Sequence, residues 1–520
     1  MTHVVVIGAG HNGLVAAIHL AAHGLDVTVV EHAAEPGGAT RSVEATLPGF
    51  VHDHCAGFLP MTAASPAMRE LRLEREGVEW IDPPAILAHP FADGRAIVLH
   101  RDVAATVASL GGAAGRGWEE AMERMLPLAT PLVESILSPL PPGRPALRLA
   151  ASLRADLGEW SRRLLASVEA LGLDLFDGDR RATAWLSGSA QHSGLPPATT
   201  ISGAFGFLLQ ILGHSHGWPI PRGGVGTIAN ALVRRAEREG AVVRCEAPVA
   251  EILIAGDGRG GGRLNRAARG ARVTGVRLQS GEELAADAIV STVSAGVLAR
   301  VLPAGALPGT LHRRLRNWRY GTGAFKLDYA LSGPVAWQAA EAREAAVVHV
   351  AGELEELTAA AQEAHRGEVP RHPALVVGQQ SLLDPTRAPA GSHTLYAYAH
   401  VPARYDESDE WVADRIEQQL ERFAPGFHSL VLHRSARPPV ETERENPSLV
   451  GGDLGGGSYE LDQQLVFRPS PSLCRYRTPV RGLYLAGAST HPGGAVHGIS
   501  GRAAAHALLR DRRLRPWRAP

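Results

Sequence analysis

Hydrophobic and polar positions at the start of the chain follow the order strand, glycine turn, helix, strand. His3–Ile7 is a short β-branched run, and Asp26–Val30 is a second apolar run. Residues 14–23 between them have helical composition, and Gly24 stands where such a helix commonly ends. The pattern therefore predicts a βαβ unit that closes at Glu31.

A second mixed region covers residues 219–293. Residues 228–239 have the period of an amphipathic helix, which Gly240 closes. Strand-like runs lie at residues 241–244, 249–254, 272–278 and 288–293. The Gly/Arg-rich stretch 256–270 between them indicates a solvated hairpin loop.

The remaining elements carry no motif until the C-terminus. Residues 102–185 are rich in Ala and Leu at helical spacing, and residues 301–440 mix helical and strand patterns. We expect both stretches to build a substrate domain. The apolar run 205–212 fits ordinary core better than a substrate tunnel or a membrane-facing surface. Near the end, the buried run 482–486 precedes a glycine-rich turn and a helical pattern at 502–509.

Composition excludes several classes of protein. The chain has 520 residues, more than one ordinary core holds, so we expect two domains. Lys and Arg number 52 against 53 Asp and Glu, which leaves no basic excess for nucleic acid binding. Cys55, Cys245 and Cys474 form no paired motif, which excludes a disulfide framework and an iron–sulfur ligand set. No apolar run reaches the roughly 18 residues of a transmembrane segment.

The first βαβ unit carries a dinucleotide-binding fingerprint. Gly8, Gly10 and Gly13 have GxGxxG spacing, and Glu31 ends the second strand. Gly8 permits the tight turn, Gly10 lets a pyrophosphate approach the backbone, and Gly13 lets helix and strand pack closely. The helix N-terminus stabilises the diphosphate, and Glu31 accepts hydrogen bonds from ribose hydroxyls. Because an acid at this position disfavours a 2′-phosphate, we expect no NADP-type ligand here.

Glycines elsewhere favour FAD over NAD. Gly37 and Gly38 stand six and seven residues beyond Glu31, where many flavoproteins bring the chain close to the extended cofactor. The stretch GLYLAGASTHPGGAVHGISG, residues 482–501, places a second strand–turn–helix junction near the C-terminus. The N-terminus of its helix can stabilise negative charge on the N1–C2=O edge of a reduced flavin.

Four segments together resemble the phytoene desaturase-related branch of the FAD-dependent amine oxidoreductases. They are VVVIGAGHNGLVAA, the acid followed by the glycine pair, WPIPRGGVGTIANAL and YLAGASTHPGGAVHG. GAGHNGL is especially similar to a subgroup named after pyridine nucleotide-disulfide oxidoreductase domain-containing protein 2. The resemblance covers roughly half of the chain. It implies an α/β fold, in which a Rossmann-type FAD-binding domain carries an inserted α+β substrate domain of the amine oxidase and phytoene desaturase type.

The resemblance also implies which residues contact FAD. Those for the ADP half are Gly8, Gly10, Gly13, Glu31, Gly37, Gly38 and Val249, the last through its backbone, and those for the flavin end are Gly487, Ala488, Gly494, Ala495 and Val496. Many relatives carry Arg directly after the glycine pair; here Ala39 stands there, and we expect Arg41 to take the phosphate role. Ala488 replaces an acid that amine oxidases often have, which favours the desaturases. We expect noncovalent FAD, since Cys474 lies too close to the final glycine turn for covalent attachment.

Lys326 is the only lysine of the chain, and all other basic residues are arginine. A lysine has a compact, titratable ammonium, which arginine lacks. Lys326 lies in the alternating run GAFKLDYALSGPVAW, which resembles the amine oxidase strand whose lysine holds a water against flavin N5. We therefore expect Lys326 to be catalytic, with chance survival of one lysine as the alternative. His491 and His497, in the flavin loop, are candidates for a general base or an orienting group, although a structural hydrogen bond is favoured for each.

Two further motifs are set aside. The HDHC run at residues 52–55 has crowded ligands that alternate faces on a strand, and no second cluster completes a shell, so we expect no metal. Within PRGGVGT, residues 222–227 lack a preceding strand in the sequence pattern. We therefore expect no NAD(P)H domain, and expect O2 or a quinone to reoxidise the flavin.

These observations predict a discontinuous FAD-binding domain and an inserted substrate domain. Residues 1–85, 217–300 and 445–520 are assigned to the first, and residues 86–216 and 301–444 to the second. The expected reaction removes a hydride from a C–C bond of a hydrophobic small molecule. A flavin amine or amino-acid oxidase is one alternative, and a non-redox FAD-containing isomerase or binding protein is another. We expect a cytoplasmic protein; peripheral membrane contact stays open, and the sequence indicates no oligomeric state.

Overall fold

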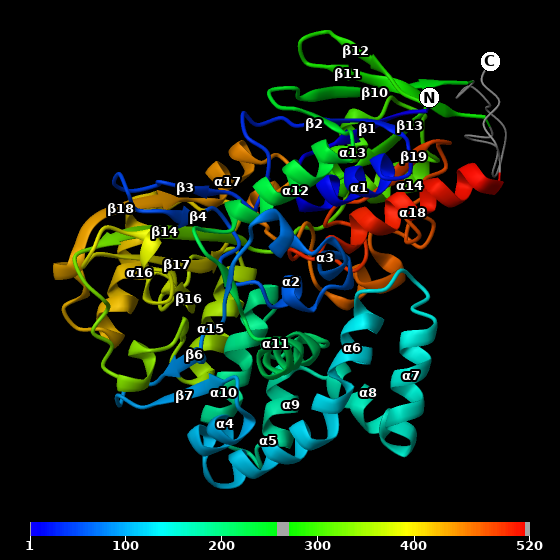
Figure 1. Cartoon of the computed structure of the whole chain (residues 1–520). Coiled ribbons are helices and arrows are strands. Elements are labelled where there is room, and N and C mark those ends of the chain that lie inside the picture. The colour runs from blue at the N-terminus through cyan, green and yellow to red at the C-terminus, as the bar shows by residue number, and fades with distance from the viewer. Residues whose placement is uncertain (1, 257–269, 515–520) are drawn as a thin grey trace.

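Two sheets organise the computed structural model, which describes residues 2–256 and 270–514 of the chain. A five-stranded sheet lies at one end and a seven-stranded sheet on the opposite side, with most of the helices between 103 and 216 below them (Figure 1). Residues 257–269 of the expected hairpin loop fall outside the described residues.

The five-stranded sheet joins the beginning, the middle and the end of the chain. Its order is β19 (Leu483–Leu485), β13 (Ala288–Ser291), β1 (His3–Ile7), β2 (Asp26–Val30) and β9 (Val242–Arg244), and every neighbouring pair is parallel. A purely parallel sheet of this kind is covered by other elements on both faces. The prediction of an α/β fold with a Rossmann-type unit is confirmed.

The two faces of β1 show how the layers form. Val4 and Val6 pack against α1 (His11–Ala21), α12 (Gly226–Arg238) and α18 (Ile499–Leu514). Val5 and Ile7 point to the other face, because side chains alternate along a strand. That face is covered by α13 (Ala295–Val301), α14 (Gly309–Arg316) and a small sheet of β10 (Val249–Ala255), β11 (Arg272–Leu278) and β12 (Glu283–Ala285).

The seven-stranded sheet is mixed. Its order is β18 (Val431–Arg437), β14 (Gly323–Leu331), β17 (His393–Val401), β16 (Leu375–Gly378), β15 (Val347–Val350), β6 (Ala85–Pro90) and β7 (Ala96–His100). Only β15 and β6 pair in parallel. One face packs on α16 (Asp409–Phe423), and the other packs on a helical layer with Trp118, Trp185 and Phe207 in its core.

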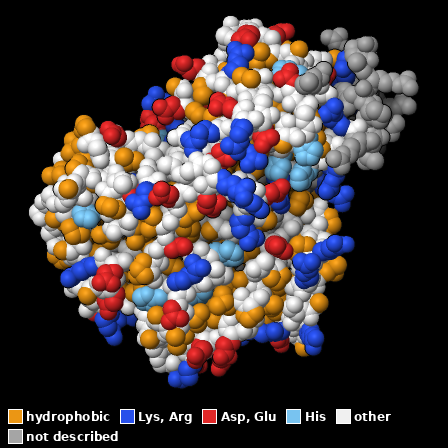
Figure 2. Space-filling view, in the orientation of Figure 1, with side chains coloured by type: hydrophobic (Ala, Val, Ile, Leu, Met, Phe, Trp, Pro, Cys, Tyr) orange, Lys and Arg blue, Asp and Glu red, His pale blue; other side chains and the backbone are white. Residues whose placement is uncertain are grey.

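The helical layer and the connecting elements complete the fold. They comprise α2 (Pro60–Ala64), α3 (Pro66–Leu71), α4 (Val103–Leu110), α5 (Gly112–Met125), α6 (Ala129–Ile136), α7 (Arg144–Leu153), α8 (Leu157–Leu165), α9 (Val168–Leu175), α10 (Arg180–Ala190), α11 (Ser202–His216), α15 (Leu354–His365), α17 (Pro439–Glu445) and the short pairs β3 (Ser42–Val43) with β4 (His52–Asp53) and β5 (Trp80–Ile81) with β8 (Ile220–Pro221). No helix of the described ranges is long and apolar enough to cross a bilayer. Acidic and basic side chains are interspersed over the face seen in Figure 2.

The strands of the two large sheets come from different segments of the chain, and these segments follow the expected domain division. All five strands of the parallel sheet lie within residues 1–85, 217–300 and 445–520, while the other large sheet takes its strands from residues 85–100 and 323–437. This distribution supports the five-segment division, which stays a proposal. The prediction that no strand precedes residues 222–227 is wrong, because β8 stands there; but β8 pairs only with β5 and adds no second dinucleotide unit.

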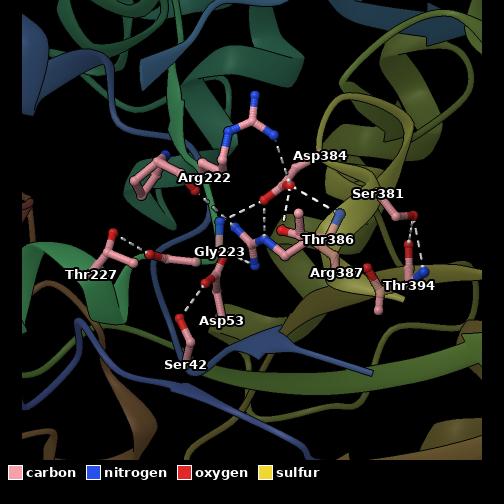
Figure 3. A network of polar contacts seen from close by, with 12 residues as sticks. Ser42, Asp53, Arg222, Gly223, Thr227, Ser381, Asp384, Thr386, Arg387 and Thr394 are labelled. Carbon is pink, nitrogen blue, oxygen red and sulfur yellow. Dashed lines mark hydrogen bonds and ion pairs between the residues drawn. The ribbon is translucent and has the colours of Figure 1, made fainter. Parts of the chain in front are cut away.

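A buried ionic network joins the two parts of the molecule (Figure 3). The Arg387 side chain is 1% exposed and lies 3.1 Å from a carboxylate oxygen of Asp53 and 3.1 Å from one of Asp384. Ahead of α12, the Val225 N–H donates to Asp53 (2.8 Å) and the Gly223 N–H donates to Asp384 (2.7 Å). The glycine-rich start of α12 thus binds carboxylates of the protein itself.

Hydrogen bonding favours the ionised form of Asp384. Burial alone would raise the pKa of Asp384, but hydrogen bonds from Thr386 and the Gly223 N–H, together with the Arg387 charge, lower this pKa below its ordinary value. The two buried carboxylates hold the arginine in place. Without the arginine, their buried negative charge would be poorly compensated, which is costly in free energy.

Replacing Arg387 with glutamine should destabilise the protein strongly. We expect Arg387→Gln to lower the free energy of unfolding by about 3–5 kcal/mol, because buried Asp53 loses its counter-ion and buried Asp384 keeps only Arg222, 3.9 Å away. The matched control is Arg366→Gln, since Arg366 pairs with Glu368 at the surface with side chains 56% and 60% exposed, and its loss should cost under about 1 kcal/mol. Urea unfolding of both variants measures the difference, and equal losses would contradict the role of the network.

Buried neutral histidines should make the protein less stable in mild acid. Burial lowers the pKa of His89 to about 4, whereas an unfolded histidine titrates near 6.5. Between these values the unfolded chain binds more protons, so stability is present above about pH 6.5 and is lost as the pH falls towards 4.

The variant His89→Gln tests this sign. The His89 Nε2–H donates to the Gly352 carbonyl (2.7 Å), a bond that a glutamine amide can also make. We expect the loss of unfolding free energy between pH 7 and pH 5 to shrink by roughly 2 kcal/mol in His89→Gln. His372→Gln, at an exposed position, should leave this pH dependence unchanged; an unchanged dependence in His89→Gln would show that His89 is protonated in the folded protein.

Candidate functional site

A cavity of about 660 Å³ lies at the carboxyl ends of the parallel strands. Gly8, Glu31, Thr292 and Gly487, which follow β1, β2, β13 and β19, line it, and Tyr396 of β17 lines it from the other sheet. The carboxyl edge of a parallel sheet is where α/β folds bind their ligands. The cavity therefore stands where the fold places a cofactor.

Thr292 brings the first and the last glycine turn together. Its hydroxyl donates to the Ile7 carbonyl (2.7 Å). A Cβ added to Gly8 would lie 2.3 Å from this hydroxyl, and one added to Gly487 would lie 2.3 Å from the Thr292 carbonyl oxygen. Both turns need glycine because they close on the same residue. The two ends of the chain thus build one site.

The three fingerprint positions require glycine for different reasons. Gly8 has φ +97°, and a Cβ on Gly13 would lie 1.9 Å from the Gly8 carbonyl oxygen, so the chain itself requires both. Gly10 has φ −72°, and its Cβ would meet no atom of the chain closer than the Gly37 carbonyl oxygen at 4.0 Å. Because Gly10 lines the cavity, its missing side chain leaves room for a group that is not protein. That space, at the start of α1, suits a diphosphate.

Glu31 is oriented by the backbone. The Ala9 N–H donates to one carboxylate oxygen (2.6 Å) and the Ala33 N–H donates to the other (3.0 Å). Each oxygen keeps a lone pair for a further donor, as ribose hydroxyls require. The Ala247 N–H donates to the Glu31 carbonyl (2.8 Å), which brings Val249 to the same stretch of cavity wall.

The C-terminal loop at the cavity is held by a buried arginine. Arg468 is fully buried and donates to the carbonyl oxygens of Ala488 (3.0 Å) and Gly455 (2.6 Å). Burial lowers the pKa of this guanidinium. In the same loop Ala495 has φ +115°, a strained value for a residue with a Cβ, and such strain concentrates at functional sites. The sequence gives no sign of Arg468, because it lies outside the glycine motif.

The predicted cofactor residues are brought together with one exception. The cavity is lined by Gly8, Gly10, Gly13, Glu31, Gly38, Arg41, Val249, Gly487, Ala488, Gly494, Ala495 and Val496. Gly37 is not among the lining residues; a Cβ there would meet the side chains of Arg41 and Ala229. That these residues contact FAD stays a prediction.

The two predicted catalytic residues lie outside the cavity wall. Lys326 is buried, forms an ion pair with Asp328 and places its ammonium 5.4 Å from the centroid of the Tyr396 ring. Burial lowers the pKa of Lys326, and the Asp328 carboxylate opposes that shift. His491 lies 3.0 Å from the Ser138 carbonyl oxygen through Nε2, and burial lowers its pKa to about 4. Their catalytic roles stay predictions.

The histidines and the acid of the HDHC run have separate protein partners. His52 lies 3.5 Å from Asp328, and His54 lies 3.1 Å from Glu445, while Asp53 belongs to the Arg387 network. Over the described ranges, no group of His, Cys, Asp and Glu side chains is arranged to hold a metal ion.

A second group of residues forms what we call the substrate chamber. It consists of Phe58, Met61, His192, Leu209, Trp218, Val347, Tyr396 and Tyr398, all of which line the cavity. Within the run 205–212, Leu209 lines the cavity, whereas Phe207 and Ile211 are core. The sequence offers one signal for this chamber: two of only eight tyrosines stand two residues apart in a strand-like run.

The chamber carries no net charge. None of its eight members is acidic, lysine or arginine, and burial lowers the pKa of its histidine, His192, to about 4. Two carboxylates line the rest of the described cavity: Glu31, bound by backbone N–H groups, and Glu445, which lies 3.5 Å from Arg437 and pairs with His54.

Relatives of known sequence span almost the whole chain. Pyridine nucleotide-disulfide oxidoreductase domain-containing protein 2 from Rattus norvegicus is 29% identical over 557 residues, covering 98% of this chain and 93% of that protein. Hydroxyneurosporene desaturase from Cereibacter sphaeroides is 30% identical over 538 residues, covering 98% of this chain and 97% of that protein.

Solved structures show the same fold. An oxidoreductase from Methanosarcina mazei superposes with a TM-score of 0.63 at 17% identity, covering 98% of this chain and 100% of that one. A triple mutant of putrescine oxidase superposes with a TM-score of 0.62 at 18% identity, covering 98% and 99%.

The family pattern described as "Flavin containing amine oxidoreductase" matches residues 13–509. This range covers the whole seven-stranded sheet, every strand of the parallel sheet except β1, and the C-terminal glycine loop at the cavity. The chain therefore belongs to the flavin containing amine oxidoreductase family, and is an oxidoreductase with a flavin cofactor.

Proposed function

We propose that this protein is an FAD-dependent oxidoreductase that removes a hydride from a C–C bond of a neutral hydrophobic small molecule. The observation that carries the proposal is the substrate chamber, which is apolar and aromatic and has no charged side chain. Burial of apolar surface is then the main source of binding free energy for the substrate.

The residues present fit FAD held without a covalent bond. Gly10 and the N-terminus of α1 would bind the diphosphate, Glu31 the ribose, Arg41 a phosphate oxygen, and the loop from Gly487 to Val496 the flavin end. Cys474 is buried and donates to the Pro471 carbonyl (3.2 Å), outside the lining residues. The bound flavin supplies the hydride acceptor, and we propose O2 or a quinone as its oxidant.

The absence of charge in the chamber favours C–C over C–N oxidation. A protonated amine would lose its hydration in the chamber without a carboxylate to replace it. An amino-acid carboxylate would likewise lack a cation among the chamber residues. The relative named hydroxyneurosporene desaturase points the same way. Amine oxidation remains the alternative, because the faces of Tyr396 and Tyr398 can attract a cation.

The proposal includes a cytoplasmic location with peripheral membrane contact. A hydrophobic substrate is concentrated in lipid, so contact with a membrane would shorten its path to the cavity. Three consecutive apolar residues offer a surface for such contact: Leu465, Val466 and Phe467 are 49%, 41% and 43% exposed.

A methyl group at Gly10 should block the cofactor without disturbing the fold. A Cβ there enters the cavity and meets no protein atom within 3.4 Å. We expect Gly10→Ala to be purified folded, with the apo-protein melting as wild type, but with FAD affinity reduced by at least about tenfold, since the diphosphate can no longer approach the backbone. Flavin content and reconstitution with FAD measure the affinity.

Gly13→Ala is the matched control for that experiment. Its Cβ would collide with the Gly8 carbonyl oxygen at 1.9 Å, so this variant should lose stability as well as FAD. If Gly10→Ala bound FAD like wild type, the diphosphate would have to lie elsewhere.

The class of substrate can be read from the flavin itself. Under anaerobic conditions, neutral terpenoid and polyene compounds should bleach the visible flavin absorbance, and a panel of amines and amino acids should not. Bleaching by amines alone would establish the C–N alternative, and failure of every compound to bleach a fully loaded flavin would favour the non-redox alternative.

A further inference from the structure

We propose that the substrate carries one oxygen atom, as a hydroxyl or carbonyl group, on its otherwise apolar skeleton, and that the Tyr396 hydroxyl binds this atom. The inference deepens the proposed function and rests on it, because it names the class of neutral molecule that the substrate chamber accepts. Tyr396 would act as a specificity-determining residue.

Among the described residues, the Tyr396 hydroxyl has no hydrogen-bond partner. The residue is 7% exposed and lines the cavity, yet no described residue makes a hydrogen bond with its hydroxyl. Burial raises the pKa of Tyr396 well above its ordinary value, so the phenol keeps its proton and can donate. Because Tyr396 lines the cavity, a polar atom of a bound ligand can supply the missing partner of this hydroxyl.

Two glycines fix the position of the Tyr396 ring. A Cβ on Gly378, within β16, would lie 2.3 Å from Cε1 of this ring. One on Gly57 would lie 2.8 Å from the same atom and 3.2 Å from the hydroxyl oxygen. Neither glycine has a positive φ that would require it for backbone reasons, and glycine weakens a strand. Both glycines leave room for this ring, and Gly57 also leaves room for the Gln380 amide, whose Nε2 a Cβ there would meet at 2.5 Å. The ring position is thus shaped by its surroundings.

The neighbouring polar groups of the chamber are already paired. The Tyr398 hydroxyl lies 3.3 Å from His192 Nδ1, and His192 Nε2 shares a hydrogen bond of 3.1 Å with His349 Nε2. The rings of Tyr396 and Tyr398 stack at 21° with centroids 6.3 Å apart, so both lie on one face of β17. The chamber thus offers one free donor beside a paired one, which matches a ligand with one oxygen.

A lysine lies beneath the ring. Lys326 and Asp328 of β14 pair across the ladder with Tyr398 and Tyr396, which places all four on one face of the sheet. The Lys326 ammonium faces the Tyr396 ring, a contact that helps to hold the ring in place. Since Asp328 neutralises the lysine, the pair adds no net charge, and a neutral oxygen is favoured over a carboxylate.

The test uses probes that differ by one oxygen. FAD-loaded protein is titrated with the hydrocarbon limonene and the ketone carvone, and with a longer pair of terpenoid ketone and hydrocarbon of matched skeleton. Binding is followed by calorimetry and by the perturbation of the oxidised flavin spectrum, with no turnover. We expect wild type to bind the ketones about 3–10-fold more tightly than the hydrocarbons, which is the range of one hydrogen bond.

Two matched variants locate the effect. In Tyr396→Phe the preference for the ketone should vanish while the Kd of the hydrocarbon stays as in wild type. In Tyr398→Phe the preference should remain, because that hydroxyl is already paired with His192.

The outcomes separate this inference from the proposed function. If both proteins bind the hydrocarbon, and Tyr396→Phe prefers the ketone as much as wild type does, the inference is overturned while the proposed function stands. Binding of amines in place of both neutral probes would overturn the proposed function, and the inference with it.

Discussion

Arg387 holds the molecule together at the point where its two sheets meet. It binds Asp53 and Asp384, whose carboxylates in turn accept the backbone N–H groups ahead of α12. The helix start that follows PRGG resembles a phosphate site in sequence, but its anion is supplied by the protein. The cavity is lined by residues of both sheets. A motif that looks like a second nucleotide site is therefore a structural connection.

Glycine serves three separate purposes around the cavity, which a sequence motif does not distinguish. Gly8 and Gly13 are needed because neighbouring parts of the chain occupy the space of a Cβ, whereas Gly10 faces open cavity. Gly57 and Gly378 leave space for a tyrosine ring. Which group fills the space beside a glycine decides whether its replacement harms folding, cofactor binding or substrate recognition.

The parts of the fold that are local in sequence could be predicted, and those that depend on register could not. β1 and β2 coincide with their predicted ranges, because a period of two and the glycine spacing are both contained in about thirty residues. The strand of Lys326 was predictable for the same reason. Its contact with Tyr396 was not, because that contact follows from the pairing of β14 with β17, about seventy residues apart. The chamber draws His192, Trp218 and Tyr396 from three distant elements, none of which carries a motif.

The charges around the cavity are arranged unequally. At the C-terminal loop, Arg468 is a buried cation that donates to backbone carbonyl oxygens, including that of Ala488. Beside the chamber, Lys326 is neutralised by Asp328, and within the chamber His192 is kept uncharged by burial. In the reaction that we propose, a hydride would leave a neutral substrate for a flavin held at the loop that Arg468 supports. A positive charge fixed at that end alone would stabilise the charge as it separates without binding the substrate more tightly, which is the condition for accelerating a chemical step.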